Sequence, residues 1–119
     1  MLDHTKLRAF ELADEAAILV YRVAAGLPKE ELFGLTSQLR RAGVSVPSNI
    51  VEGCARDSEA EYLGFLNIAF GSLRGLHDQL NLSKRLGFLP NEDSSLVEPT
   101  VVETEKVLNG LIRALRDNV

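Results

Sequence analysis

Four segments of this chain carry apolar residues at alternating spacings of three and four, which is the pattern of amphipathic helices packed along one side. No stretch shows the two-residue alternation of a half-buried strand, and the connections between the segments are only a few residues long. Short connections place consecutive helices antiparallel. The sequence therefore predicts an all-α fold, an antiparallel up-down-up-down four-helix bundle.

The first two segments have recognisable boundaries. An apolar stripe covers residues 10–24, and Gly26 followed by Pro28 stops the first helix. The second segment opens with the acidic pair 30–31, which is favourable in the first turn of a helix, and finishes near Gly53. We therefore expect the second helix to begin at about residue 30.

The third segment has the clearest ends. Ser58 followed by Glu61 is typical of a capping box, and Gly87 suits the left-handed residue that terminates many helices. Between these ends the apolar residues follow a strict heptad spacing. Gly71 and Gly75 lie four residues apart, and we expect them to let a neighbouring helix approach.

The fourth apolar stripe covers residues 97–115, and Pro99 is expected in the first turn, where its missing N–H would be unpaired in any case. A chain of 119 residues with 45% hydrophobic content can build one core and has little room for a second. Residues 1–119 are therefore predicted to form a single four-helix bundle domain.

Pro47 falls inside the second helical pattern, where it removes a backbone donor and presses its ring against the carbonyl group four residues earlier. That carbonyl belongs to a glycine, and nearby serine and asparagine side chains can bond the backbone groups that a bend exposes. We predict that the second helix is kinked at Pro47. The residues assigned to this kink are Gly43, Ser45, Pro47, Ser48, Asn49, Glu52 and Gly53.

Four polar residues, Arg41, Ser45, Ser48 and Glu52, share one face of the second helix because they are spaced by four, three and four. One interpretation is a polar site for an anion or an RNA phosphate, with Arg40 beside it. The other is structural: the hydroxyls bond the kinked backbone, and Arg41 pairs with a carboxylate across a helix or subunit interface. The structural interpretation is favoured, because proline kinks need such partners.

The charge distribution argues against a protein that mainly covers phosphates. The net charge is -4, both ends of the chain are acidic, and residues 37–57 carry only three basic against two acidic residues. A local basic patch could still contact nucleic acid or a protein partner. Its candidate residues are Arg40, Arg41, Arg56, Lys84 and Arg85.

The residue types needed for catalysis or metal binding are not arranged in any recognised pattern. His4, His77 and Cys54 lack metal-ligand spacing, and Arg74 stands where a di-iron bundle would need glutamate three residues before a histidine. No serine-histidine-aspartate set and no phosphate-binding glycine loop stands out. The sequence therefore predicts no catalytic residue, no metal and no cofactor.

The expected location is the cytoplasm. No run of about eighteen apolar residues could cross a membrane, and the acidic N-terminus does not resemble a signal peptide. The single cysteine, Cys54, rules out an internal disulfide and agrees with a reducing compartment.

The run from Gln38 to Gly53, with its internal proline, resembles the signature of a four-helix-bundle family named for intervening sequences in bacterial 23S rRNA genes. Further similar stretches are Leu35–Ala42, Glu52–Ser58, Glu61–Tyr62, Phe65–Leu66, Ala69–Leu73 and Leu86–Leu89. The chain departs from the family at Gly75 and His77, where members usually have glutamates. The resemblance implies a four-helix bundle that assembles into homo-oligomeric rings, commonly pentamers, with no established biochemical activity. A distant relative, the accessory protein of diversity-generating retroelements, is a similar but basic ring that binds nucleic acid and a reverse transcriptase.

Three hypotheses follow for the function. The first is a non-enzymatic homo-oligomeric scaffold or interaction module, because the first and third helices have apolar residues on more than one face. The second is an RNA- or DNA-binding accessory protein that uses a basic patch on the assembled ring. The third, an enzyme with an unrecognised site, is disfavoured by the missing catalytic sets. The identity of any further protein partner is left open.

Overall fold

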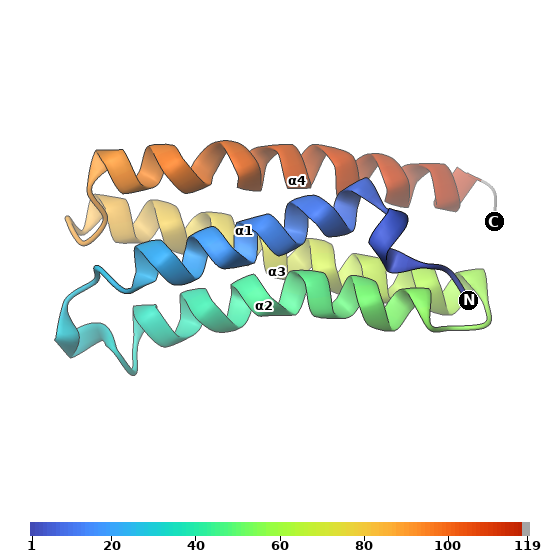
Figure 1. Cartoon of the computed structure of the whole chain (residues 1–119), viewed down its shortest axis with the longest axis horizontal. Helices are drawn as coiled ribbons and strands as arrows, with labels where there is room; N and C mark the ends of the chain where they lie inside the picture. The colour runs from blue at the N-terminus through green and yellow to red at the C-terminus, as the bar shows by residue number, and fades with distance from the viewer. Residues whose placement is uncertain (118–119) are drawn as a thin grey trace.

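Four long helices of alternating direction lie side by side in the structure, a computed structural model that describes residues 1–117 (Figure 1). They are α1 (Arg8–Ala24), α2 (Leu35–Cys54), α3 (Glu59–Arg85) and α4 (Asn91–Asp117). Two short 3₁₀ helices, η1 (His4–Lys6) and η2 (Lys29–Glu31), precede α1 and α2. The described residues contain no strand, so the predicted all-α four-helix bundle is confirmed.

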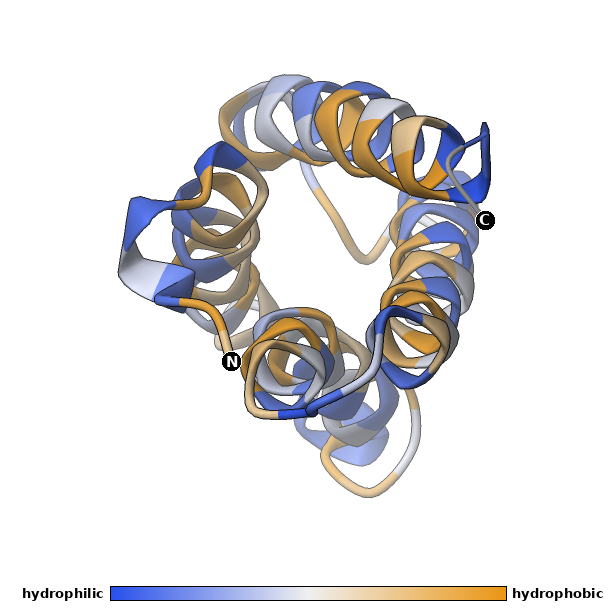
Figure 2. Cartoon of the chain, turned by 90° about the vertical axis from the view of Figure 1, so that its right-hand side faces the viewer, coloured by the Kyte–Doolittle hydropathy of each residue, from blue (hydrophilic) through white to orange (hydrophobic). Residues whose placement is uncertain are grey.

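Each helix packs on two neighbours around one interior: α1 and α3 each contact both α2 and α4. Seen along the bundle, every helix carries both hydrophobic and hydrophilic residues around its circumference (Figure 2). The apolar stripes of the sequence form the core, and burial of each large aliphatic side chain stabilises the fold by about 1.5–3 kcal/mol. The largest fully buried side chains include Val20, Leu39, Ile50, Leu66, Leu73, Leu76, Val97, Val101 and Leu108.

The two ends of α3 form as the sequence predicts. At the start, the Ser58 hydroxyl accepts a hydrogen bond from the Glu61 N–H at 3.1 Å and donates to the Glu61 carboxylate at 3.2 Å. At the end, Gly87 adopts a φ of 80°, and the Phe88 N–H donates to the Ser83 carbonyl at 2.9 Å. These bonds satisfy backbone groups that a helix terminus otherwise leaves unpaired.

The predicted start of α2 is wrong: the helix begins at Leu35, and the acidic pair 30–31 belongs to η2. Gly34 breaks the helical path with φ -112° and ψ -114°. The Glu31 carboxylate then accepts a hydrogen bond from the Leu35 N–H at 3.2 Å. It therefore stabilises the first turn of α2 although Glu31 lies outside that helix. As a result Leu32 and Phe33 lie in the connection, and Phe33 is 94% exposed.

The position expected for Pro99 is also wrong, because α4 begins at Asn91 and contains Pro99 in its interior. Proline there leaves the carbonyl group of Ser95 without its helical donor. Both residues are exposed, so water can take the place of that donor. Exposure therefore makes an interior proline tolerable in α4.

Pro47 lies inside α2 and is buried. The Asn49 amide donates to the Ser45 carbonyl at 2.8 Å and to the Ser45 hydroxyl at 3.0 Å, and that hydroxyl bonds the Ser72 hydroxyl of α3 at 2.8 Å. The Asn49 side chain therefore bonds the backbone near the proline, as predicted, whereas the Ser45 hydroxyl bonds only the Asn49 and Ser72 side chains and Ser48 is exposed. The bend itself stays a prediction.

The glycines of the bundle differ in what surrounds them. A Cβ atom at Gly53 would lie 3.0 Å from the Phe65 Cβ, and one at Gly43 would lie 3.3 Å from the Val20 Cγ1, so both allow a close helix contact. A Cβ at Gly71 or Gly75 would meet nothing within 4 Å. The expectation that these two glycines admit a neighbouring helix is therefore wrong for the described chain.

Candidate interaction surface

Two open grooves lie next to each other between α1 and α2, on the outside of the bundle. One has a volume of about 780 Å³ and the other about 500 Å³, and Val44 lines both. We call the surface formed by the residues of these two grooves the α1–α2 face. It combines exposed apolar side chains with charged groups, and the two grooves differ in the sign of their charge.

The larger groove, here the basic groove, contains two guanidinium groups. Its main lining residues are Tyr21, Leu32, Phe33, Arg40, Arg41 and Val44, and no carboxylate from residues 1–117 lines it. The Arg40 guanidinium carbon lies 5.1 Å from the centre of the Tyr21 ring, within range of a cation–π contact. The buried Nε of Arg40 has no hydrogen-bond partner in the described chain. This groove is therefore suited to an occupant with apolar groups and negative charge.

The second groove, here the acidic groove, has the opposite character. Its main lining residues are Phe10, Asp14, Ala17, Pro47, Val51 and Glu52, and none of the basic residues in the described chain lines it. Because the two grooves share Val44, the α1–α2 face is apolar along its length, basic at one end and acidic at the other.

The polar stripe predicted on the second helix lies on this face. Arg41 and Ser45 line the basic groove, and Ser48 and Glu52 line the acidic groove. Arg41 forms no ion pair with any of residues 1–117, so the predicted pairing with a carboxylate of another helix does not occur within the described chain. A pairing across a subunit interface stays a prediction.

The five predicted contact cations lie at different places on the bundle. Arg56 follows α2 at one end of the molecule, where its guanidinium carbon lies 4.7 Å from the centre of the Phe65 ring. Lys84 and Arg85 occupy the last turn of α3 at the opposite end (Figure 1). Only Arg40 and Arg41 share a groove.

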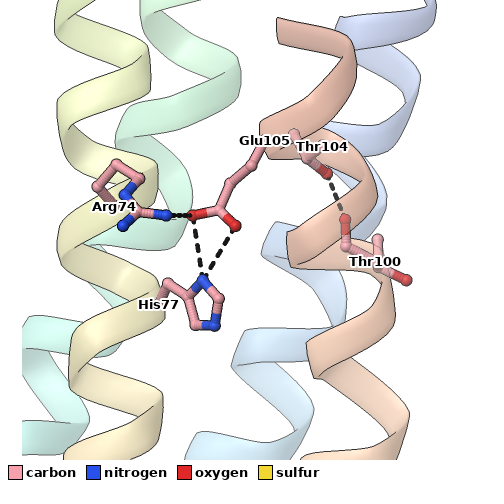
Figure 3. A network of polar contacts seen from close by, with 5 residues as sticks. All are labelled: Arg74, His77, Thr100, Thr104 and Glu105. Carbon is pink, nitrogen blue, oxygen red and sulfur yellow. Dashed lines mark hydrogen bonds and ion pairs between the residues drawn. The ribbon is translucent and has the colours of Figure 1, made fainter. Parts of the chain in front are cut away.

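A cluster of ionisable side chains that sequence reasoning missed joins α3 to α4 (Figure 3). Arg74 and His77 on α3 both point to Glu105 on α4, with Arg74 NH1 at 2.9 Å and His77 Nδ1 at 3.0 and 3.1 Å from its carboxylate oxygens. Glu105 is nearly buried, and its carboxylate would be costly there without these partners. The sequence signal that could have indicated this cluster was an acidic residue next to the apolar stripe of the fourth segment.

Cys54 and Tyr62 lie in apolar surroundings near the end of α2. Burial raises the pKa of the Cys54 thiol and raises the pKa of Tyr62 to about 12. Both groups are therefore protonated at neutral pH, and a protonated thiol is a poor nucleophile. Residues 1–117 also contain no group of three or more His, Cys, Asp or Glu side chains placed to hold a metal ion.

No helix within residues 1–117 is both long enough and apolar enough to cross a membrane.

Comparison with known proteins identifies the family. No functionally curated protein matches the chain. A crystal structure from Bacteroides thetaiotaomicron, of an S23 ribosomal protein family member of unknown function, is similar, with a TM-score of 0.80 and 24% identity over 88% of this chain and 95% of that one. That likeness supports the fold. The family model of the 23S rRNA-intervening sequence protein matches residues 5–110, and the chain therefore belongs to the 23S rRNA-intervening sequence protein family.

Proposed function

We propose that this protein is a non-enzymatic homo-oligomeric scaffold or interaction module, and that the α1–α2 face mediates its assembly. The observation that carries the proposal is the set of aromatic, aliphatic and arginine side chains exposed on that face. Phe33 is 94% exposed, and Tyr21, Leu32 and Val44 are each exposed by 43% or more. Tyrosine, phenylalanine and arginine are enriched in the centres of protein interfaces, and grouped exposed apolar side chains favour association.

The chemistry of the described residues supports a non-enzymatic role. Within residues 1–117, the ion pairs that join two helices all involve Glu105, whose carboxylate is occupied by Arg74 and His77. Cys54 is protonated and buried, so it is not an activated nucleophile. Neither the family description nor that of the solved relative refers to an enzyme.

Sedimentation velocity with light scattering, over a protein concentration series from nanomolar to tens of micromolar, tests the proposal. We expect a concentration-dependent oligomer, and the family resemblance leads us to expect a ring of five copies. Phe33→Ser should shift the assembly toward monomer without loss of helicity, because Phe33 is exposed and makes no contribution to the core. A monomer at every concentration would refute the proposal.

A second candidate function, binding of RNA or DNA as an accessory protein, is favoured by one observation. In the basic groove Arg40 lies against the Tyr21 ring with Arg41 nearby, an arrangement that can stack a base and contact a phosphate. The net charge of -4, repeated in each copy, opposes this function. We therefore place it second.

A further inference from the structure

A ridge of exposed side chains runs along α4 on the outside of the bundle. Its members are spaced by three, four or seven residues, so they share one side of the helix. We define the α4 ridge as Glu92, Leu96, Glu103, Lys106, Gly110 and Arg113. Leu96 is 61% exposed, and none of the four charged members forms an ion pair with any of residues 1–117.

The charge of the α4 ridge changes sign along the helix. Glu92 and Glu103 lie in the first half of α4, and residues 91–103 contain four acidic residues and no basic one. Lys106 and Arg113 follow in the second half. The ridge is therefore acidic at one end, basic at the other, and apolar at Leu96 within its acidic half.

This order is the reverse of the charge order on the α1–α2 face at the same levels of the bundle. A Cβ atom at Gly26, which closely follows α1, would lie 3.9 Å from the Asp93 Oδ2 near the start of α4. Helix α4 therefore begins at the end of the bundle where α1 stops and where Tyr21 lines the basic groove (Figure 1). The acidic half of the ridge is level with the basic groove, and the basic half is level with the acidic groove.

From this order we propose that the α1–α2 face of one copy packs against the α4 ridge of the next copy, in a head-to-tail contact that repeats around the ring. Arg40 and Arg41 of the basic groove then meet Glu103 of the next copy, and its Leu96 packs near Phe33. Glu52 of the acidic groove meets the basic half of the same ridge. The inference rests on the proposed function, because it names the second surface of the assembly contact.

The position of α4 in the bundle suits a ring. Helices α2 and α4 both contact α1 and α3 but not each other within residues 1–117, so they lie diagonally across the bundle. The α4 ridge and the α1–α2 face therefore point to different sides, as a head-to-tail contact requires. Around a ring whose axis runs along the bundles, adjacent copies keep the same helix direction, so residues at the same level meet.

Charge complementarity favours a second copy as the occupant of this face. Two copies with a net charge of -4 repel each other overall, so only a contact that pairs opposite charges locally is favourable. The α4 ridge meets that condition at both grooves at once, and every copy of the chain supplies it.

Charge-swap variants of the full chain test the contact. Arg41→Glu alone and Glu103→Arg alone should each raise the protein concentration needed for assembly by about tenfold, because each places like charges opposite one another in every contact. The chain with both changes should assemble again, because every contact then pairs opposite charges. Lys84→Glu changes a charge on α3, outside both surfaces, and should leave assembly unchanged.

A mixture of two further variants distinguishes a head-to-tail contact from a two-fold one. Phe33→Ser impairs the α1–α2 face and keeps the α4 ridge, whereas Leu96→Arg impairs the ridge and keeps the face; both side chains are exposed, so the core is unchanged. Each variant alone should shift toward monomer. Their mixture should form a pair that contains one copy of each, joined by the one contact that stays intact. A two-fold contact between identical faces would leave Leu96→Arg able to assemble alone.

The readouts are the assembly concentration from sedimentation velocity, the composition of each oligomer from native mass spectrometry, and helicity from circular dichroism as a folding control. Recovery in the doubly changed chain together with the mixed pair supports the contact. If the wild type assembles but either result is missing, the contact is overturned and the proposed function stands. A monomeric wild type overturns both.

Discussion

Replacement of Gly53 by alanine should destabilise the protein, although alanine is the better helix former. The added Cβ would lie 3.0 Å from the Phe65 Cβ, 3.1 Å from the Tyr62 Cδ1 and 3.3 Å from the Tyr62 carbonyl oxygen. Two of these atoms are backbone or directly attached to it, so they move only if α2 and α3 separate. Overpacking of this kind costs about 1–3 kcal/mol.

The gain from helix propensity is smaller than this cost. A glycine-to-alanine change inside a helix contributes about 1 kcal/mol, and less at Gly53, which lies one residue before the end of α2. The expected net loss of unfolding free energy is about 1–2 kcal/mol. At this chain length such a loss lowers the Tm by roughly 3–8 °C.

Urea unfolding followed by circular dichroism, at one fixed protein concentration, measures the difference. The fixed concentration matters because association also stabilises the folded state. Gly71→Ala is the matched control: Gly71 is inside α3, exposed, and its Cβ would meet nothing within 4 Å, so this variant should gain about 0.5–1 kcal/mol. If Gly53→Ala is as stable as Gly71→Ala, the close approach of α2 and α3 at this point is not a constraint.

Three further predictions concern the kink, nucleic acid and a buried phenol. Pro47→Ala should restore a backbone donor and straighten α2, so that oligomer size changes more than helicity; unchanged values of both would make the proline incidental. The protein should bind structured RNA, single-stranded DNA and duplex DNA weakly or not at all in fluorescence anisotropy near physiological salt. Submicromolar binding that Arg40→Glu combined with Arg56→Glu abolishes would instead favour the accessory-protein function. The folded-state pKa of Tyr62 is raised from 10.0 to about 12, so its protonated form is favoured by folding. Its contribution to stability should therefore be complete below about pH 10 and decline as pH rises toward about 12, and the Tyr62→Phe variant should lack this decline in pH-dependent urea titrations.

Features that depend on neighbours along one helix could be read from the sequence. The heptad stripe of α3 became the core, the Ser58 capping box formed, and Gly87 took a positive φ at the end of the helix. Each depends on residues three to five positions apart, and helix geometry alone brings such residues together. The sequence by itself therefore determined the helix number, the bundle class and the ends of α3.

Features that depend on burial or on a second helix could not be read in this way. Pro99 is tolerated inside α4 because it faces water, and spacing alone could not show that Gly53 meets α3 while Gly71 meets nothing. The Glu105 cluster likewise joins residues from two helices.

The α1–α2 face was likewise determined partly by the sequence and partly by the tertiary structure. The stripe from Arg41 to Glu52 was visible on one helix, but its basic and acidic grooves are completed by Tyr21 and Asp14 of α1. The rotation of each helix about its own axis decides which side chains meet across helices. That rotation is set by packing of the whole core, and so only the tertiary structure decided it.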